Sequence, residues 1–416
     1  MLAGMGRYEL TPPLGVELAG YGYYLNRRSD TVLDPLYTRA LYVTTEEEKW
    51  LLVSCDVLGL SRSIVKEAQE ALLQKGFTPA QIMMVSIHTH TGPALKYHEG
   101  CGYVSPEYAK TVTSRIIAAC EAAVADARPV TVLKGALAPL AGGFVYNRAD
   151  TRGPVDETVR GFLLERGQSR PIAVVSYACH AVSRGRASGI SADYPGALNA
   201  LLEKEGYVPM YINGLCGDID PRVEDGQDRD ARMEAFAQAI RQAFFKNLTL
   251  LPVSLQAGRL SHTLSLQPAT RAQIMQAAED AVDHAGGEAK PVARVARIWE
   301  KEMLDGYENL EYQEEITISF AKLGGRLVLA LPFEGFTQIG RHLRERLDAP
   351  EAIVLGCAEE LLGYLPTRDD IARGAYAALE STFLYKRLPV LPGEAERLSD
   401  CMADALMARN ETIKKK

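Results

Sequence analysis

The order of the predicted elements constrains this fold more than any other feature of the sequence. Through the first 250 residues, short apolar runs rich in β-branched residues alternate with amphipathic segments. This alternation is typical of a layered α/β protein, in which helices cover the faces of a sheet. The predicted strands are 40–45, 50–57, 82–88, 130–134, 172–178 and 209–212, and the predicted helices are 63–75, 106–127, 194–205 and 229–245.

Beyond residue 250 the predicted order changes, with a strand, a pair of helices and a strand hairpin. The predicted strands are 251–266, 315–323 and 326–331, and the predicted helices are 268–284 and 291–304. Gly286-Gly287 separates the two helices, and Gly324-Gly325 supplies a hairpin turn. We see no sequence repeat and no linker, so we expect one α/β unit that spans residues 1–416.

Composition excludes several classes of function. Hydrophobic residues make up 47% of the 416-residue chain, which is enough for a large core. A formal net charge of −7 argues against nucleic acid as a partner, because nucleic acid is bound through clustered Lys and Arg. No segment has the length and apolarity of a membrane span, and the N-terminus lacks a secretory signal pattern. The seven cysteines form no C-x-x-C pair, which favours reduced, buried thiols. We therefore expect a cytoplasmic protein with a small-molecule substrate and no stable membrane anchor, and leave a homo-oligomer open.

Two histidines, His88 and His90, stand at the end of the predicted strand 82–88. Because side chains alternate along a strand, we expect both imidazoles to project from the same face. Gly92-Pro93 ends the strand directly afterwards, where functional sites commonly lie. An H-x-H motif by itself fits two hydrogen-bonded or surface histidines equally well.

A third histidine, His180, follows the predicted strand 172–178. The carboxyl ends of parallel strands are where such sheets present ligands, so His88 and His180 are candidates for a shared metal ion. Zinc fits imidazole ligands and needs further donors to reach four-coordination. The remaining histidines are expected at the surface, namely His98, His262, His284 and His342.

Two residues of the C-terminal third could complete a zinc site. Glu334 follows an apolar strand in the turn Leu331-Pro332-Phe333-Glu334-Gly335, where its alternative role is in the first turn of a helix. Tyr364 lies in the loop Gly363-Tyr364-Leu365-Pro366, where its alternative role is a packed turn aromatic.

Further polar clusters follow predicted strands. Asn147-Arg148 offers a guanidinium suited to a carboxylate or a developing oxyanion, with a surface ion pair as the alternative. The turn 213–221 contains Asp218 and Asp220 but lacks the spacing of a phosphate-binding loop. Neither a G-x-S-x-G nor an H-E-x-x-H motif occurs, which argues against a serine hydrolase and a helix-borne metalloprotease.

Taken together, these motifs resemble the catalytic domain of the neutral, non-lysosomal ceramidase family. The resemblance runs in order through nearly the whole chain: Gly6-Arg7-Tyr8-Glu9-Leu10-Thr11-Pro12, His88-Thr89-His90-Thr91-Gly92-Pro93, Asn147-Arg148, His180, Gly217-Asp218, Leu331-Pro332-Phe333-Glu334, Tyr364 and Tyr376. It implies a layered α/β catalytic domain with the metal at strand ends. It also leads us to expect no C-terminal Ig-like accessory domain.

The resemblance also implies roles for individual residues. The implied Zn²⁺ ligands are His88, His180, Glu334 and Tyr364. His90 would be the acid/base residue, and Arg148 would bind substrate or stabilise an oxyanion. The residues placed around the substrate are Asn147, Asp218, Asp220 and Tyr376. The implied reaction is attack of a zinc-activated water on the amide carbonyl of an N-acyl compound.

This sequence departs from the family pattern in ways that bear on the substrate. The family's Gly-Asp-Val-Ser-Pro string is Gly-Asp-Ile-Asp-Pro here, so Asp220 replaces a serine and favours a more polar or cationic ligand. The missing accessory domain and signal peptide favour a soluble substrate, and Tyr376 competes with Tyr364 as the ligand. Two alternatives stay open: a metal-dependent hydrolase of a glycosidic or ester bond that uses Asp193, Asp218 and Asp220, and a non-catalytic binding relative.

Overall fold

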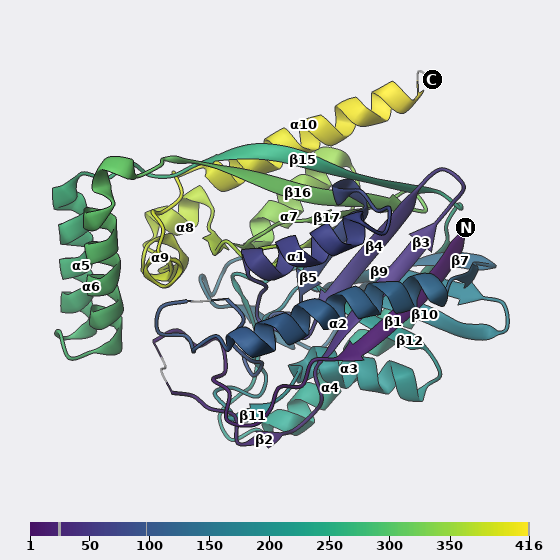
Figure 1. Cartoon of the computed structure of the whole chain (residues 1–416), viewed down its shortest axis with the longest axis horizontal. Coiled ribbons are helices and arrows are strands. Elements are labelled where there is room, and N and C mark those ends of the chain that lie inside the picture. The colour runs from purple at the N-terminus through teal and green to yellow at the C-terminus, as the bar shows by residue number, and fades with distance from the viewer. Residues whose placement is uncertain (24–25, 97, 415–416) are drawn as a thin grey trace.

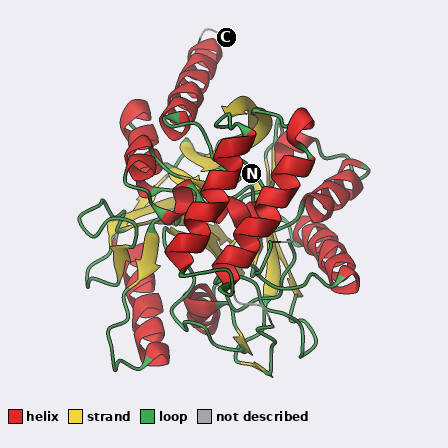
Figure 2. Ribbon diagram, turned by 90° about the vertical axis from the view of Figure 1, so that its left-hand side faces the viewer, coloured by secondary structure: helices red, strands yellow, loops and turns green. Residues whose placement is uncertain are grey.

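The computed structural model describes residues 1–23, 26–96 and 98–414. Strands form the interior and helices lie outside them (Figure 1, Figure 2), so the predicted layered α/β class is confirmed. Within the described residues, no helix combines the length and apolarity needed to cross a membrane.

One arrangement of strands occurs three times along the chain. Each unit has three antiparallel strands, a crossover helix and a fourth strand that pairs parallel with the third. The first unit consists of β1 (Leu2–Glu9), β3 (Tyr37–Thr44), β4 (Lys49–Cys55), α1 (Arg62–Leu73) and β5 (Ile82–Ser86). The second consists of β7 (Val132–Pro139), β9 (Thr158–Arg166), β10 (Ser169–Tyr177), α3 (Asp193–Lys204) and β12 (Val208–Asn213). The third consists of β15 (Leu255–Ser265), β16 (Gln313–Leu323), β17 (Arg326–Ala330), α7 (Thr337–Leu347) and β19 (Ile353–Leu355).

The remaining elements extend or connect these units. The other helices are α2 (Pro106–Ala125), α4 (Arg229–Lys246), α5 (Arg271–Ala285), α6 (Pro291–Asp305), α8 (Arg368–Ala372), α9 (Glu380–Tyr385) and α10 (Glu394–Lys414). The short strands are β2 (Thr31–Val32), β6 (Arg128–Pro129), β8 (Val145–Asn147), β11 (Gly189–Ile190), β13 (Ile219–Pro221), β14 (Leu248–Leu250), β18 (Glu334–Gly335) and β20 (Tyr364–Leu365). Helices α5 and α6 form a hairpin between β15 and β16 that stands off the body (Figure 1). Gly286 ends α5 in the left-handed conformation, with φ +81°.

The inner strands, such as β4, β5 and β12, are buried on both faces, which explains their nearly continuous apolar runs in the sequence. Leu51 and Val53 of β4 pack in the cluster that includes helices α1 and α2. Their neighbour Leu52 points the other way, into a central core that also contains Phe162 of β9 and Val328 of β17. Alternate residues of one strand therefore serve two different cores.

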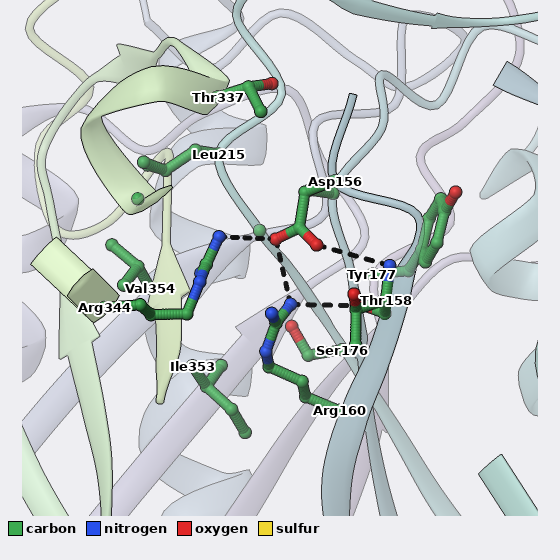
Figure 3. Close-up of a pocket in the computed structure, with 13 residues that line it drawn as sticks. Asp156, Thr158, Arg160, Ser176, Tyr177, Leu215, Thr337, Arg344, Ile353 and Val354 are labelled. Carbon is green, nitrogen blue, oxygen red and sulfur yellow. Dashed lines mark hydrogen bonds and ion pairs between the residues drawn. The ribbon is translucent and has the colours of Figure 1, made fainter. Parts of the chain in front are cut away.

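A buried carboxylate links the second unit to the third. Asp156 Oδ2 accepts hydrogen bonds from Arg160 of β9 at 2.9 Å and from Arg344 of α7 at 2.6 Å (Figure 3). All three side chains are only 10–11% exposed, and they line a cavity of about 20 Å³. This cavity has the size of a single water molecule, so the cluster joins the units rather than forming a ligand pocket.

The three units bring their strand ends to one place. His88 follows β5 of the first unit, His180 follows β10 of the second, and Glu334 follows β17 of the third. Each unit thus supplies one of the polar side chains that meet at the candidate metal centre.

Candidate metal centre

The three clustered imidazoles belong to two loops that pair with each other. The His90 N–H donates to the Ala181 carbonyl at 3.3 Å, and Thr89 and Ala181 form a parallel bridge. The ring centroids of His88 and His180 are 4.9 Å apart, and those of His88 and His90 are 5.0 Å apart. The predicted convergence of these side chains on one place is confirmed.

The geometric reason that the sequence offered for this convergence is wrong. Strand β5 ends at Ser86, and His88 has φ +65°, so the strand alternation expected for 82–88 does not reach the histidines. The chain turns instead, and the His88 N–H donates to the Val57 carbonyl at 3.0 Å. A non-glycine residue in the left-handed region is strained and is held there by its surroundings.

Backbone carbonyls fix the tautomers of His88 and His180. His88 Nδ1 lies 2.8 Å from the Leu58 carbonyl oxygen, and His180 Nδ1 lies 2.6 Å from that of Cys216. A carbonyl only accepts, so both Nδ1 atoms carry the proton and both Nε2 atoms present lone pairs. Each Nε2 lies 3.1 Å from the same atom, Oε2 of Glu334.

The Glu334 carboxylate is positioned by a short parallel pairing and by a phenol. Strand β18 pairs with β20, which sets Glu334 opposite Tyr364. The Tyr385 hydroxyl donates to Glu334 Oε1 at 2.6 Å. The other oxygen, Oε2, is the one that faces the Nε2 atoms of His88 and His180.

Tyr364, rather than Tyr376, lies at the edge of this cluster. Its hydroxyl accepts a hydrogen bond from Arg148 Nη2 at 2.9 Å, and the same nitrogen is 3.2 Å from His180 Nε2. Tyr376 contacts the Tyr364 ring, with centroids 5.9 Å apart. The position of Tyr364 favours it as the phenolic ligand.

His90 differs from the other two histidines in its tautomer. The Tyr21 backbone N–H donates to His90 Nδ1 at 3.3 Å, so Nδ1 is an acceptor and the proton of the neutral ring is on Nε2. That Nε2 is buried and has no hydrogen-bond partner among the described residues. Burial holds the pKa of His90 well below its usual range. At Gly20 a Cβ would lie 2.5 Å from the His90 ring, so only glycine fits beside it.

Arg148 is anchored at the mouth of the cluster. Its Nη2 donates to the Gly217 carbonyl at 3.1 Å, and its Nη1 lies 3.2 Å from Asp220 Oδ1. With these contacts and the one to Tyr364, the guanidinium is fixed beside the lone pairs rather than free at the surface.

The other carboxylates weighed from the sequence have structural partners. Asp218 accepts from the Thr337 N–H and hydroxyl at 2.8 and 2.9 Å and from Asn147 Nδ2 at 2.9 Å. Burial raises the pKa of Asp218 to about 6. The Asp193 carboxylate, at the start of α3, accepts hydrogen bonds from the backbone N–H groups of Ser183, Arg184 and Tyr194. Of these carboxylates, Asp220 is the one that contacts Arg148 in the site.

Sequence patterns gave no sign of several residues around the cluster. Tyr385 hydrogen-bonds Glu334 across 51 positions, and His98, with its ring 4.4 Å from that of Tyr385, is buried. The surface position expected for His98 is therefore wrong, as is that of His262, which is also buried. His284 is exposed, as expected.

The residues present fit a divalent cation. One ligand atom from each of His88, His90 and His180 lies within 4.8 Å of the others, and all three rings are buried. The His88 Nε2 lone pair is buried, has no hydrogen-bond partner among the described residues and faces the Glu334 carboxylate, which is costly unless a cation occupies the space between them. The tautomers separate the roles, because His88 and His180 present lone pairs while His90 presents an N–H.

Comparison with solved structures identifies the fold. No protein-family model matches the sequence, and no curated protein does. The crystal structure of neutral ceramidase from Pseudomonas aeruginosa superposes with a TM-score of 0.74 at 16% identity, over 98% of this chain and 74% of that one. A structure described as ceramidase complexed with C2 also gives 0.74, at 14% identity, over 98% of this chain and 75% of that one. The chain has a neutral-ceramidase-like fold. The resemblance inferred from the sequence motifs is thus confirmed for the fold.

Proposed function

We propose that this chain is a zinc-dependent hydrolase that cleaves the amide of an N-acyl compound. The observation that carries the proposal is the pair of lone-pair nitrogens of His88 and His180, each 3.1 Å from one oxygen of Glu334. The shared fold with two ceramidases supports amide cleavage as the reaction class.

The proposed zinc ligands are His88, His180, Glu334 and Tyr364, a nitrogen and oxygen set that suits Zn²⁺. A zinc ion bound there would lower the pKa of a coordinated water and polarise a carbonyl oxygen. Backbone carbonyls hold the two imidazoles in place, and the Tyr385 hydroxyl holds the carboxylate. Hydrogen bonds of this kind orient metal ligands and tune the metal that they bind.

Arg148 and His90 complete the proposed site. The guanidinium of Arg148, held by Gly217 and Asp220, supplies fixed positive charge where an oxyanion develops. The neutral His90 directs its Nε2–H into the same space and acts as a hydrogen-bond donor to substrate. As a general base His90 would need the other tautomer, and as a general acid it would need the imidazolium; both put a proton on Nδ1 and give up the Tyr21 hydrogen bond.

The test uses three fluorogenic substrates: an N-dodecanoyl amide of 7-amino-4-methylcoumarin, the dodecanoyl ester of 4-methylumbelliferone, and a 4-methylumbelliferyl glycoside. We expect release from the amide, loss of that release after chelation, and recovery on adding zinc. Amide cleavage that survives chelation would contradict zinc dependence. Cleavage of the ester or the glycoside alone would show that this bond, and not an amide, is the one the protein cleaves. As a control, His342→Ala should leave the rates unchanged, because His342 pairs with Asp400 on the helices α7 and α10.

A further inference from the structure

A groove of about 1140 Å³ lies between α6 and the segments 22–23 and 99–100. It begins beside the proposed site. Tyr21, the residue before the first segment, contacts the His90 ring at a centroid distance of 4.9 Å. The guanidinium of Arg186, which also lines the groove, lies 5.9 Å from the centroid of the Tyr21 ring.

The groove wall and the metal centre have a common support. Trp299 of α6 donates to the Arg387 carbonyl at 2.9 Å, and its ring lies 4.8 Å from that of Phe383. Tyr385, the donor to Glu334, lies between Phe383 and Arg387 in the sequence. Helix α6 is thereby fixed relative to the site.

One side of the groove is apolar. Its apolar lining residues are Tyr23, Pro291, Val292, Val295 and Ile298. Residues 291, 295 and 298 follow the helical spacing that places side chains on one face, so α6 presents an apolar stripe along the groove. Such a stripe binds aliphatic carbon, because burying apolar surface is favourable.

The charged lining is unbalanced toward cations. Both carboxylates that line the groove, Glu99 and Glu288, already form ion pairs with basic side chains. Lys290 and Arg294 also line it, and neither side chain forms an ion pair or hydrogen bond with another residue that the structure describes. In a chain with a net charge of −7, two unpaired cations beside an apolar stripe complement an amphiphilic anion.

We propose that this groove binds the part of the substrate remote from the scissile amide, and that this part is an aliphatic chain bearing a negative charge. The proposal rests on the proposed function and names its substrate class: N-acyl compounds that are amphiphilic anions. The aliphatic segment lies along Tyr23, Val295 and Ile298, and the anionic group meets Lys290 and Arg294. Asp220 does not oppose this polarity, because Arg148 balances its charge.

The experiment compares coumarin amides of equal acyl length that end in a carboxylate, a methyl or a trimethylammonium group. For the intact protein at low salt, we expect kcat/KM to be about tenfold higher for the carboxylate than for the trimethylammonium amide, as two exposed charge pairs allow. The preference should shrink in 1 M salt, because exposed charges are screened. Lys290→Glu/Arg294→Glu should abolish it. The matched control Lys110→Glu/Lys246→Glu makes the same change in net charge on α2 and α4, and should keep it.

A binding measurement separates this proposal from the proposed function. Calorimetric titration with dodecanedioate should give a dissociation constant that rises about tenfold in the groove variant and stays unchanged in the control. If dodecanedioate binds in this way but no amide is hydrolysed, the groove proposal is supported and the proposed hydrolase function is refuted. Equal hydrolysis of the three amides, or equal dodecanedioate binding by both double variants, would refute the groove proposal.

Discussion

Replacing Asp156 by Asn should cost much more stability than the small change in side chain suggests. The substitution leaves Arg160 and Arg344 facing a neutral amide, with all three side chains 10–11% exposed. Removing one partner of a buried ion pair typically costs about 3–5 kcal/mol. Arg160 keeps the carbonyls of Pro350 and Thr158, so most of the loss falls on Arg344, and we expect about 3 kcal/mol, the lower end of that range.

The pH dependence of this effect has a definite sign. Burial works against the Asp156 charge, but Arg160 and Arg344 outweigh it and hold the pKa below its usual range. A carboxylate whose pKa is depressed by folding contributes its full stability above the pKa of the unfolded chain, about 3.9. This stability is lost as the pH falls toward the pKa of the folded protein. The difference between wild type and Asp156→Asn should therefore stay constant from about pH 5 to 8 and shrink below about pH 4.

Urea unfolding of the two proteins gives the free-energy difference. The matched control is Asp400→Asn, because Asp400 also bridges two cationic partners, Arg346 and His342, but is 45% exposed. An exposed bridge of this kind contributes about 1 kcal/mol or less. Equal losses in the two variants would refute the argument from burial.

The remaining predictions concern the support of the proposed site. Tyr385→Phe removes the hydrogen bond to Glu334 Oε1, and we expect the zinc affinity, measured in competition with a chelating dye, to fall about 10–100-fold. The control Tyr376→Phe should leave the zinc affinity unchanged. Equal losses in the two variants would show that Tyr385 does not position Glu334. Gly20→Ala places a methyl group 2.5 Å from the His90 ring, so zinc per chain should stay constant while amide hydrolysis drops, and unchanged hydrolysis would show that the ring position is unimportant.

Burial explains which elements the sequence predicted well. Strands β4, β5, β10 and β12 are buried on both faces and stand out as apolar runs. Helices with clear start signals, such as α2 after Ser105 with Pro106 in its first turn, begin where expected. The threefold recurrence of one topology was not predicted, because each unit satisfies the same pattern of burial with unrelated residues.

The site was predictable only to the extent that its residues end strands. His88, His180 and Glu334 follow β5, β10 and β17, one in each unit, and the sequence singled them out for that reason. The turn at His88 depends on a tertiary hydrogen bond to Val57, which no local pattern encodes. Tyr385 reaches the cluster only through tertiary packing, so no motif marks it.

The most direct test of a shared metal ion is zinc per chain, measured by elemental analysis after dialysis. We predict one zinc in wild type and in His90→Ala, and almost none in His88→Ala or His180→Ala, because only the latter two present Nε2 lone pairs. Equal zinc content in all three variants, or none in wild type, would contradict the account.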